Sequence, residues 1–459
     1  MALNLPLRKI PAELKIPRDF DVVVYVEGDS YFARDSRGSI ICKDSRTACI
    51  QEAIDYVLGN GGGKVYLRKG IYRTNRYINI RDNNVELYGD GMGRTVIENY
   101  STLDPTIYIG WDNQTSIIAR NIYIHDLTID AKYQYDPSNP QGNGNSTLWA
   151  YYVSDLRLER IEHKNAYWRT MITPGSVGCG GNCIQENIII KENVFRGVAL
   201  SLGGIRNLVL ENNIFYGSAS SPDFNTIMDF SYGEYQDSYV YNATVRGNIF
   251  YKSGRHPYNR VGWVAVIGGF IRVVGASWVG NVFIDPDTIA IYVQDVTASG
   301  TTLDLRGVEF IGNVIIGQGR LDNAIVVKQK NVTIKGNYIE NTNDVAISIN
   351  SGESVIEGNY ISETATAGIW ASNSRITIVG NMLKNCAKSR DKCIILDGTS
   401  AYSVVLGNRL FRNIATYLPR AVDTSASQGY NIIVGNVAEG QWALQKYSTQ
   451  MSDIVTNNI

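Results

Sequence analysis

The chain has 459 residues, of which 43 are basic and 44 acidic, so its net charge is −1. This balance argues against a nucleic-acid partner, which needs a basic face, and against electrostatic docking on anionic lipid. No apolar run reaches the roughly 18 residues that a membrane span needs. Residues 1–20 lack the apolar core of a secretory signal peptide. The composition therefore excludes nucleic-acid-binding and membrane-spanning proteins.

Residues 1–44 are predicted to form an N-terminal arm and a small β-hairpin region. Residues 21–42 contain three short runs of strand-forming residues, separated by turns at Gly28 and at 36–38. A capping helix is predicted within 45–63, with Asp44 or Ser45 as its N-cap and a glycine-rich run at its end. Its apolar face combines Ile50, Ile54, Val57 and Leu58. We expect this helix to cover the open first turn of the strands that follow.

Residues 64–459 repeat a short phrase: an apolar residue, any residue, Gly-Asn, any residue, and an apolar residue. Its asparagines are Asn248, Asn281, Asn313, Asn337, Asn359, Asn381, Asn408 and Asn436, with weaker copies at Asn193 and Asn213. The steps range from 22 residues (337 to 359) to 33 residues (248 to 281). Such a period, in segments rich in Val, Ile and Tyr, indicates a stacked all-β solenoid. The asparagines are expected to be structural and to stack as an amide ladder.

The run 49–91, CIQEAIDYVLGNGGGKVYLRKGIYRTNRYINIRDNNVELYGDG, resembles the entry segment of right-handed parallel β-helix proteins of the pectate-lyase superfamily. The Gly-Asn copies resemble the repeats of the same pectin-lyase-like family, so the resemblance extends from about residue 45 to the end. It implies an all-β, right-handed parallel β-helix with an N-terminal capping helix. It does not fix one activity, because this fold hosts lyases, hydrolases, epimerases and viral tailspikes.

A set of outward-facing residues follows the Gly-Asn motifs, because side chains alternate between the two sides of a strand. Aromatic rings stack on sugars, and amides and charged groups bond to hydroxyls, so such a stripe suits a glycan. The alternative is an ordinary solvated sheet surface. The predicted column contains Asp229, Tyr292, Gln294, Lys328, Asn350, Trp370 and Asp397.

Two long loops, 220–239 and 253–263, hold the predicted chemistry. The catalytic candidates are Asp229, Glu234, Asp237, Arg255 and His256, and further substrate-binding candidates are Asp223, Tyr258, Arg260 and Trp263. The remaining histidines, His125 and His163, fall at repeat positions and are expected to belong to the scaffold.

Two reactions remain open for these loops. In a uronate lyase, Arg255, Arg260 or a Ca²⁺ held by the acids would neutralise the substrate carboxylate. His256, Tyr258 or an arginine would then remove the C5 proton. A glycoside hydrolase would instead need two carboxylates roughly 5 to 9.5 Å apart. The four acids of the loops can supply such a pair. No cofactor other than Ca²⁺ is suggested.

Six cysteines form three local pairs: Cys42 with Cys49, Cys179 with Cys183, and Cys386 with Cys393. An even count in local pairs predicts short-loop disulfides, and the alternative is free thiols buried in the core. Disulfides would indicate an oxidising compartment or a hyperthermophilic host. The spacing does not fit a zinc site.

These observations predict an extracellular protein that acts on an acidic or decorated polysaccharide, as a lyase or a glycoside hydrolase. The rival is a non-catalytic virion tailspike or fibre, or a cell-surface glycan-binding protein. The last rung supports this alternative. Asn458 follows Asn436 by 22 residues, and the sequence shows no segment that would cap the end of the solenoid. An uncapped solenoid end exposes apolar surface, which suggests a homo-oligomer through that end or cover by a following domain. The alternative is that Trp442 and Tyr447 fold over the end.

Overall fold

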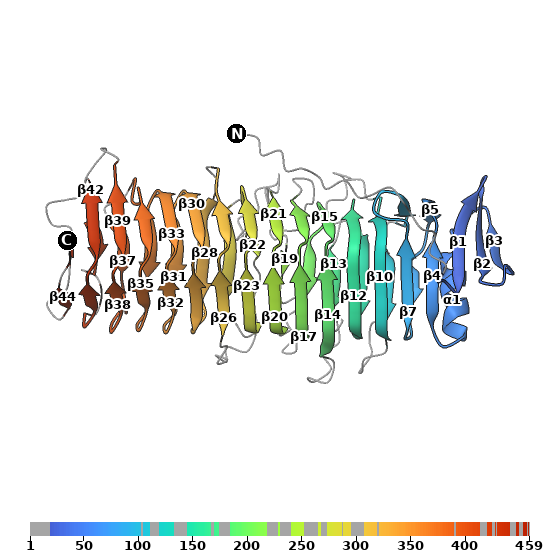
Figure 1. Ribbon diagram of the computed structural model, residues 1–459, viewed down its shortest axis with the longest axis horizontal. Coiled ribbons are helices and arrows are strands. Elements are labelled where there is room, and N and C mark those ends of the chain that lie inside the picture. The colour runs from blue at the N-terminus through green and yellow to red at the C-terminus, as the bar shows by residue number, and fades with distance from the viewer. Residues whose placement is uncertain are drawn as a thin grey trace.

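The computed structural model describes residues 19–459 except 102–103, 111–118, 133–144, 167–168, 174–183, 218–227, 230–239, 252–264, 268–272, 287, 295–306, 319–320, 390–391, 414–419, 425–426, 428, 441–446, 449–452, 457 and 459. The described chain is one elongated stack of parallel strands, with the N-terminal hairpin and helix at one end (Figure 1). The predicted fold class, a right-handed parallel β-helix, is confirmed. No helix in the described ranges is both long enough and apolar enough to cross a membrane.

Each rung contributes strands to three parallel sheets, which we call sheets 1, 2 and 3. Sheet 1 contains β4 (Gly63–Leu67), β7 (Val85–Gly89), the first halves of β10 (Ala119–Asp130) and β12 (Val153–Lys164), β14 (Gln185–Lys191), β17 (Ile205–Glu211), β20 (Val240–Arg246), β23 (Val273–Val279), β26 (Val308–Ile311), β29 (Val332–Lys335), β32 (Val355–Glu357), β35 (Thr377–Val379), β38 (Val404–Leu406), β41 (Ile432–Val434) and β44 (Ile454–Thr456).

Sheet 2 is continuous with sheet 1 through β10 and β12, so the two form one 30-stranded sheet together with the N-terminal strands β1, β2 and β3. Sheet 2 contains the second halves of those strands and β5 (Gly70–Thr74), β8 (Thr95–Asn99), β15 (Val194–Arg196), β18 (Ile214–Tyr216), β21 (Ile249–Tyr251), β24 (Val282–Ile284), β27 (Val314–Ile316), β30 (Tyr338–Thr342), β33 (Tyr360–Thr364), β36 (Met382–Lys384), β39 (Arg409–Arg412) and β42 (Val437–Gly440).

Sheet 3 is the separate 14-stranded sheet. It contains β6 (Ile78–Ile80), β9 (Pro105–Gly110), β11 (Ser146–Tyr151), β13 (Thr170–Thr173), β16 (Leu200–Leu202), β19 (Met228–Asp229), β22 (Ala265–Ile267), β25 (Thr288–Gln294), β28 (Leu321–Lys328), β31 (Val345–Ile349), β34 (Ala367–Ala371), β37 (Lys392–Leu396), β40 (Arg420–Asp423) and β43 (Tyr447–Ser448).

The N-terminal hairpin, rather than the helix, covers the first edge of sheet 1. Strands β1 (Val22–Glu27), β2 (Ser30–Asp35) and β3 (Ile40–Asp44) are antiparallel, and β1 pairs in parallel with β4. Helix α1 (Ile50–Gly59) lies over the end of the core and buries Ile50, Ala53, Ile54 and Val57. The hairpin therefore satisfies the strand edge while α1 closes the apolar interior.

The predicted N-cap of α1 is wrong. The cap residue is Cys49, in a left-handed conformation with φ 51° and without a side-chain cap bond. Asp44 instead accepts hydrogen bonds from the Arg46 N–H at 2.6 Å and the Thr47 hydroxyl at 3.0 Å. The carboxylate thus stabilises the turn before the helix, which leaves it too far from the first helical N–H groups.

The asparagine ladder is present at the bend between sheets 1 and 2. Oδ1 of Asn337 accepts both the backbone N–H and the side-chain amide of Asn313, one rung earlier, at 2.9 Å each. The Asn337 amide in turn donates to Oδ1 of Asn359 and to the Phe310 carbonyl, again at 2.9 Å. The same pattern joins Asn193, Asn213, Asn248, Asn281, Asn313, Asn337, Asn359, Asn381, Asn408, Asn436 and Asn458. The repeated Asn is therefore structural, as predicted.

Two of the three predicted disulfides lie in the described residues. Cys42 is bonded to Cys49, which ties β3 to the start of α1. Cys386 is bonded to Cys393 across the connection between β36 and β37. Cys179 and Cys183 lie outside the described residues. Each observed bond closes a loop next to an element end, where it restrains the geometry of one rung.

Candidate functional site

On the outer side of sheet 3, residues in register from strand to strand form two runs, which together we call the central row. The inward neighbours in the same strands, such as Ile107, Ile109 and Leu148, are fully buried. The row runs from β6 to β19 and again from β25 to β43 through Asn79, Tyr108, Trp149, Met171, Ser201 and Asp229, then Tyr292, Val326, Ser348, Trp370, Ile395, Asp423 and Ser448. Alternation along the strands therefore places these residues on the outer side of sheet 3, where Tyr108, Trp149 and Trp370 are half-buried while Ser201 and Asp423 are buried.

The N-terminal part of this surface is an aromatic patch formed by Tyr77, Tyr108, Trp149 and Tyr151. The Tyr108 ring lies 5.9 Å from Tyr77, 6.2 Å from Trp149 and 5.6 Å from Tyr151, measured between ring centroids. The indole N–H of Trp149 donates to Oγ of Ser146 at 2.8 Å, which fixes the ring on the sheet. Sequence reasoning missed this patch, because its strands precede the clear Gly-Asn repeats and only local alternation marks them.

The predicted glycan column lies at the C-terminal part of sheet 3, but in two rows. Tyr292 and Trp370 belong to the central row, whereas Lys328, Asn350 and Asp397 lie two residues further along their strands or just beyond them. The prediction that these residues form a single column was therefore wrong. The number of residues between each Gly-Asn motif and the next strand varies between rungs, so the predicted residues fall at different positions along their strands.

Some of these predicted residues contact one another. The Lys328 ammonium lies 5.4 Å from the Tyr292 ring centroid, and Tyr292 is only 7% exposed. Oδ1 of Asn350 accepts the Ser372 hydroxyl at 2.9 Å. The Trp370 indole nitrogen is buried without a hydrogen-bond partner among the described residues. The backbone of Gln294 is in register with Lys328, and the Gln294 side chain lies outside the description.

A charged cluster that sequence reasoning missed ends the central row. Asp423 is 1% exposed and pairs with Lys392, and the Arg420 guanidinium lies 3.8 Å from its other oxygen. Lys392 and Arg420 are themselves neighbours in register on β37 and β40. Two cations around one buried carboxylate leave positive charge near the surface of sheet 3.

Most of the predicted catalytic residues lie outside the described residues. These are Glu234, Asp237, Arg255 and His256, and the substrate-binding candidates Asp223, Tyr258, Arg260 and Trp263 lie outside them as well. Asp229 is described only through its backbone, which pairs with Ser201 in the central row. In the chain, 218–227 and 230–239 lead into and out of β19, and 252–264 leads into β22. Strands β19 and β22 lie in sheet 3 between the strands of the aromatic patch and those of the predicted column.

A second group of titratable residues lies on sheet 1 and its bend to sheet 2. The Arg160 guanidinium donates two hydrogen bonds of 2.7 Å to Asp126 and one of 3.1 Å to Glu159. His125 lies 2.7 Å from Asp126 through Nδ1 and 3.2 Å from Glu86 through Nε2. Burial opposes ionisation of Asp126, but hydrogen bonds from Arg160 and His125 outweigh it and lower its pKa to about 2.

This group has a backbone signature as well. Asp126 and Arg160 adopt φ values of 55° and 49°, at the bend where later rungs place Gly247 and Gly280. Non-glycine residues are uncommon in the left-handed region of φ and ψ, because it strains their backbone. Asp126 and Arg160 adopt it nonetheless. Because every carboxylate of the group has a cationic or hydroxyl partner, the arrangement is a stabilising network. The placement of His125 in the scaffold agrees with it.

Metal-type ligands gather at one place in the described chain. The Sγ atoms of Cys42 and Cys49 and a carboxylate oxygen of Glu52 lie within 4.8 Å of one another. The two sulfurs are bonded to each other, so they are not thiolates that could bind a cation. A Ca²⁺ site thus remains a prediction for the acidic residues of the 220–239 loop.

The strand order, the ladder and the capping helix together define the class. The chain is a right-handed parallel β-helix, the fold that the sequence resemblance implied. A family model described as "Right handed beta helix region" matches residues 269–438.

Comparisons with individual proteins add relatives that cover part of the chain. The chain is 26% identical over 254 residues to mannuronan C5-epimerase AlgE5 of Azotobacter vinelandii, covering 45% of this chain and 23% of the relative. It is 27% identical over 229 residues to alginate lyase 7 of the same organism, covering 48% and 22%. The chain thus spans about a quarter of the length of these curated relatives.

One solved structure is similar to this chain in its fold alone. The N-terminal fragment of bacteriophage Phi29 gene product 12 superimposes with a TM-score of 0.57 at 13% identity, covering 83% of this chain and 69% of that one.

Proposed function

We propose that the protein binds an acidic polysaccharide along the outer side of sheet 3 and acts on its uronate residues at the middle of that sheet. The aromatic patch carries this proposal, because the half-buried rings of Tyr77, Tyr108 and Trp149 adjoin one another on a parallel sheet and offer apolar faces for sugar rings. The Lys328 ammonium and the cations around Asp423 support an acidic substrate. The names of the two partial relatives, a mannuronan epimerase and an alginate lyase, support the same substrate class.

The proposed reaction begins with removal of the C5 proton of a uronate. Arg255 or Arg260 neutralises the carboxylate, which stabilises the carbanion that forms. The acids of the 220–239 loop would hold a Ca²⁺ that would supply the same positive charge. His256 or Tyr258 takes the proton. Return of a proton to the opposite face gives an epimer, and loss of the bond at C4 gives an unsaturated lyase product. Because both outcomes share the first step, the same residues serve either, at an extracellular or surface location.

The experiment is incubation with mannuronan, alginate, pectate and neutral glucan in D₂O, with Ca²⁺ or EDTA. Deuterium at C5 of intact chains indicates an epimerase, and ultraviolet absorbance of unsaturated ends indicates a lyase. Reducing ends without unsaturation would replace the proposed reaction by hydrolysis through paired acids. Binding without any product would support the non-catalytic fibre reading, and absence of both binding and turnover would overturn the proposal.

Variants separate binding from chemistry. Trp149→Ala is expected to weaken polysaccharide binding roughly ten-fold, equivalent to about 1.4 kcal/mol. Tyr338→Ala, an exposed aromatic on sheet 2, is the matched control and is expected to leave binding unchanged. His256→Ala and Arg255→Ala are expected to abolish turnover while binding persists. Full activity in both loop variants would exclude the proposed catalytic residues.

A further inference from the structure

The outer side of sheet 1 changes from charged to apolar in its last rungs. Earlier strands place ion pairs there, such as Arg246 with Glu211 at 3.0 Å and Lys335 with Glu357 at 3.1 Å. In β35, β38, β41 and β44, the same positions hold Thr377, Val379, Val404, Leu406, Ile432, Val434, Ile454 and Thr456. All of these residues are described by the structure, and none of them is charged.

The apolar positions are exposed to solvent. Leu406 is 41% exposed and Ile432 is 39% exposed. Strands β38 and β41 each pair with a strand on both sides, so this exposure does not arise from the end of the stack (Figure 1). We use the name C-terminal face for this surface, which consists of Tyr402, Val404, Leu406, Tyr430, Ile432 and Val434.

The two tyrosines of the C-terminal face stack on each other in solvent. Their ring centroids lie 5.6 Å apart with planes at 13°, and Tyr402 is 65% and Tyr430 60% exposed. Their φ values are 55° and 59°, a left-handed conformation that is an outlier for a bulky residue. Other rungs place Asn207, Gly275 and Asn331 at this bend. The rings are thus held outward against backbone strain, which motivates a functional role for them.

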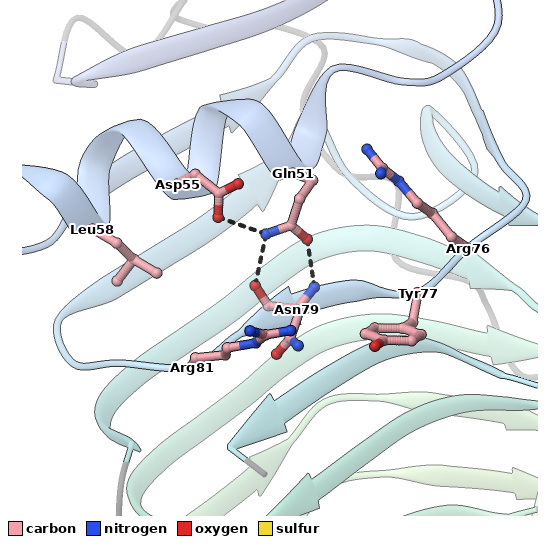
Figure 2. A pocket seen from close by; sticks show the side chains of 7 residues that line it. All are labelled: Gln51, Asp55, Leu58, Arg76, Tyr77, Asn79 and Arg81. Carbon is pink, nitrogen blue, oxygen red and sulfur yellow. Dashed lines mark hydrogen bonds between the residues drawn. The ribbon is translucent and has the colours of Figure 1, made fainter.

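The opposite end of the solenoid is satisfied by contacts within the chain. A hollow of about 450 Å³ lies between α1 and β6 (Figure 2). There, Oε1 of Gln51 accepts the Asn79 backbone N–H at 2.7 Å, and Nε2 donates to Asp55 at 2.8 Å (Figure 2). Arg76, at the same hollow, is paired with Glu52 at 3.1 Å. The exposed apolar surface therefore lies at the C-terminal rungs and not beside α1.

The chemistry of the C-terminal face favours a second copy of the chain as its partner. A twofold contact places the same patch on both sides, so an uncharged apolar face brings no like charges together. The two tyrosines alone expose about 200–300 Å². A standard interface buries about 800 Å² per partner, a little over half of it apolar. With its aliphatic neighbours, the C-terminal face approaches that apolar area.

We propose that two copies of the chain associate through the C-terminal face about a twofold axis, with their solenoids antiparallel. A parallel pair would bring the whole of sheet 1 into contact and would take charges such as Glu211 and Lys335 out of water, which is costly. An antiparallel pair overlaps only at the apolar rungs. The homo-oligomer predicted from the sequence would thus form through the side of these rungs and not through their end. Sheet 3 takes no part in this contact, so the proposal is independent of the proposed function.

The test is analytical ultracentrifugation of the full chain over a range of protein concentrations. The wild-type protein should show a monomer–dimer equilibrium. In Tyr402→Gly/Tyr430→Gly, the dissociation constant of the dimer should rise about 100-fold or more, because buried aromatic rings dominate interface energies. Glycine adopts a left-handed φ without strain, so the thermal midpoint of the monomer should not fall. Tyr338→Ser/Tyr360→Ser removes a stacked pair from sheet 2, 5.1 Å apart, and should leave the equilibrium unchanged.

Small-angle X-ray scattering tests the orientation, because an antiparallel dimer should be much longer than the monomer. A dimer as long as the monomer would overturn the antiparallel contact. Equal dissociation constants for the wild type and the Tyr402/Tyr430 variant would exclude the C-terminal face as the interface. A wild-type protein that stays monomeric at every concentration would overturn the proposal. If that monomer loses polysaccharide binding in the same variant, the face belongs to a glycan instead.

Discussion

His163 is an ionisable residue in the core of the solenoid. It is fully buried and stacks on Phe195 at 4.6 Å, at the start of a line of rings that continues through Phe215, Phe250 and Phe283. Nδ1 lies 3.0 Å from the Thr147 hydroxyl, and Nε2 has no partner among the described residues. Burial lowers the pKa of His163 to about 3. The imidazole is thus neutral in the folded protein.

Acid should therefore destabilise the protein through His163. Because the folded pKa lies below the unfolded value, the stabilisation is complete above roughly pH 6.5 and is lost as the pH falls towards about 3. The free energy of unfolding should drop by about 2 kcal/mol between pH 7 and pH 5 from this residue alone. Denaturant titrations of His163→Phe should show a flatter pH dependence in that window. Thr147→Val, which keeps the imidazole, should retain the original slope, and an unchanged slope in His163→Phe would contradict the assignment.

The residues of the candidate site could be predicted only in part. Lys328, Asn350 and Trp370 were found because each follows a clear Gly-Asn motif, which marks where the next outward positions occur. Tyr108 and Trp149 were missed, since 41 residues separate them and no motif fixes their register.

At the scale of elements, the bends determine the position of a rung in the stack more strongly than the strands do. Many strands have only three residues, such as β32 and β35, yet the rungs from Asn193 onward keep their place because the asparagine ladder fixes the bend. A second line of left-handed residues marks the bend from sheet 3 to sheet 1, including Asn207, Gly275 and Asn331. The fold was predictable because the sequence marks one of these bends with the same dipeptide in each later rung.

Removal of one asparagine side chain from the ladder should therefore strongly lower the free energy of unfolding. Asn337→Ala leaves the backbone N–H and the amide of Asn313 without their acceptor. Two unsatisfied buried donors should lower the free energy of unfolding by about 2–4 kcal/mol. Asn331→Gly, at the opposite bend of the same rung with φ 56°, is the matched control and should cost less than about 1 kcal/mol. Equal losses in urea denaturation would show that the ladder contributes no special stability.

For the whole molecule, each rung contacts chiefly the rungs beside it, so stability should be local along the axis. The Cys386 to Cys393 bond restrains one C-terminal rung, and the Cys42 to Cys49 bond restrains the N-terminal end (Figure 1). In a stack with nearest-neighbour coupling, weakening of one rung need not open distant ones.

Hydrogen exchange can test this locality. Loss of the C-terminal bond in the Cys386→Ala/Cys393→Ala variant should lower local stability by about 2 kcal/mol, because the short closed loop becomes free in the open state. Amide exchange should accelerate in β33 to β42 and stay unchanged in β4 to β12. The Cys42→Ala/Cys49→Ala variant should show the opposite distribution. Uniform acceleration along the chain in either variant would indicate a single cooperative unit.

The ladder also has a consequence for how such a chain can change length over generations. Asn337, Asn359 and Asn381 are each 22 residues apart and make interchangeable hydrogen bonds. Loss of residues 338–359 would place the amide of Asn381 where that of Asn359 had been, and duplication of the same segment would repeat it. Insertions of other lengths are accommodated only between the bends. The molecule thus grows and shrinks in whole rungs of about 4.8 Å each, and the outer surface of sheet 3 lengthens or shortens by one strand at a time.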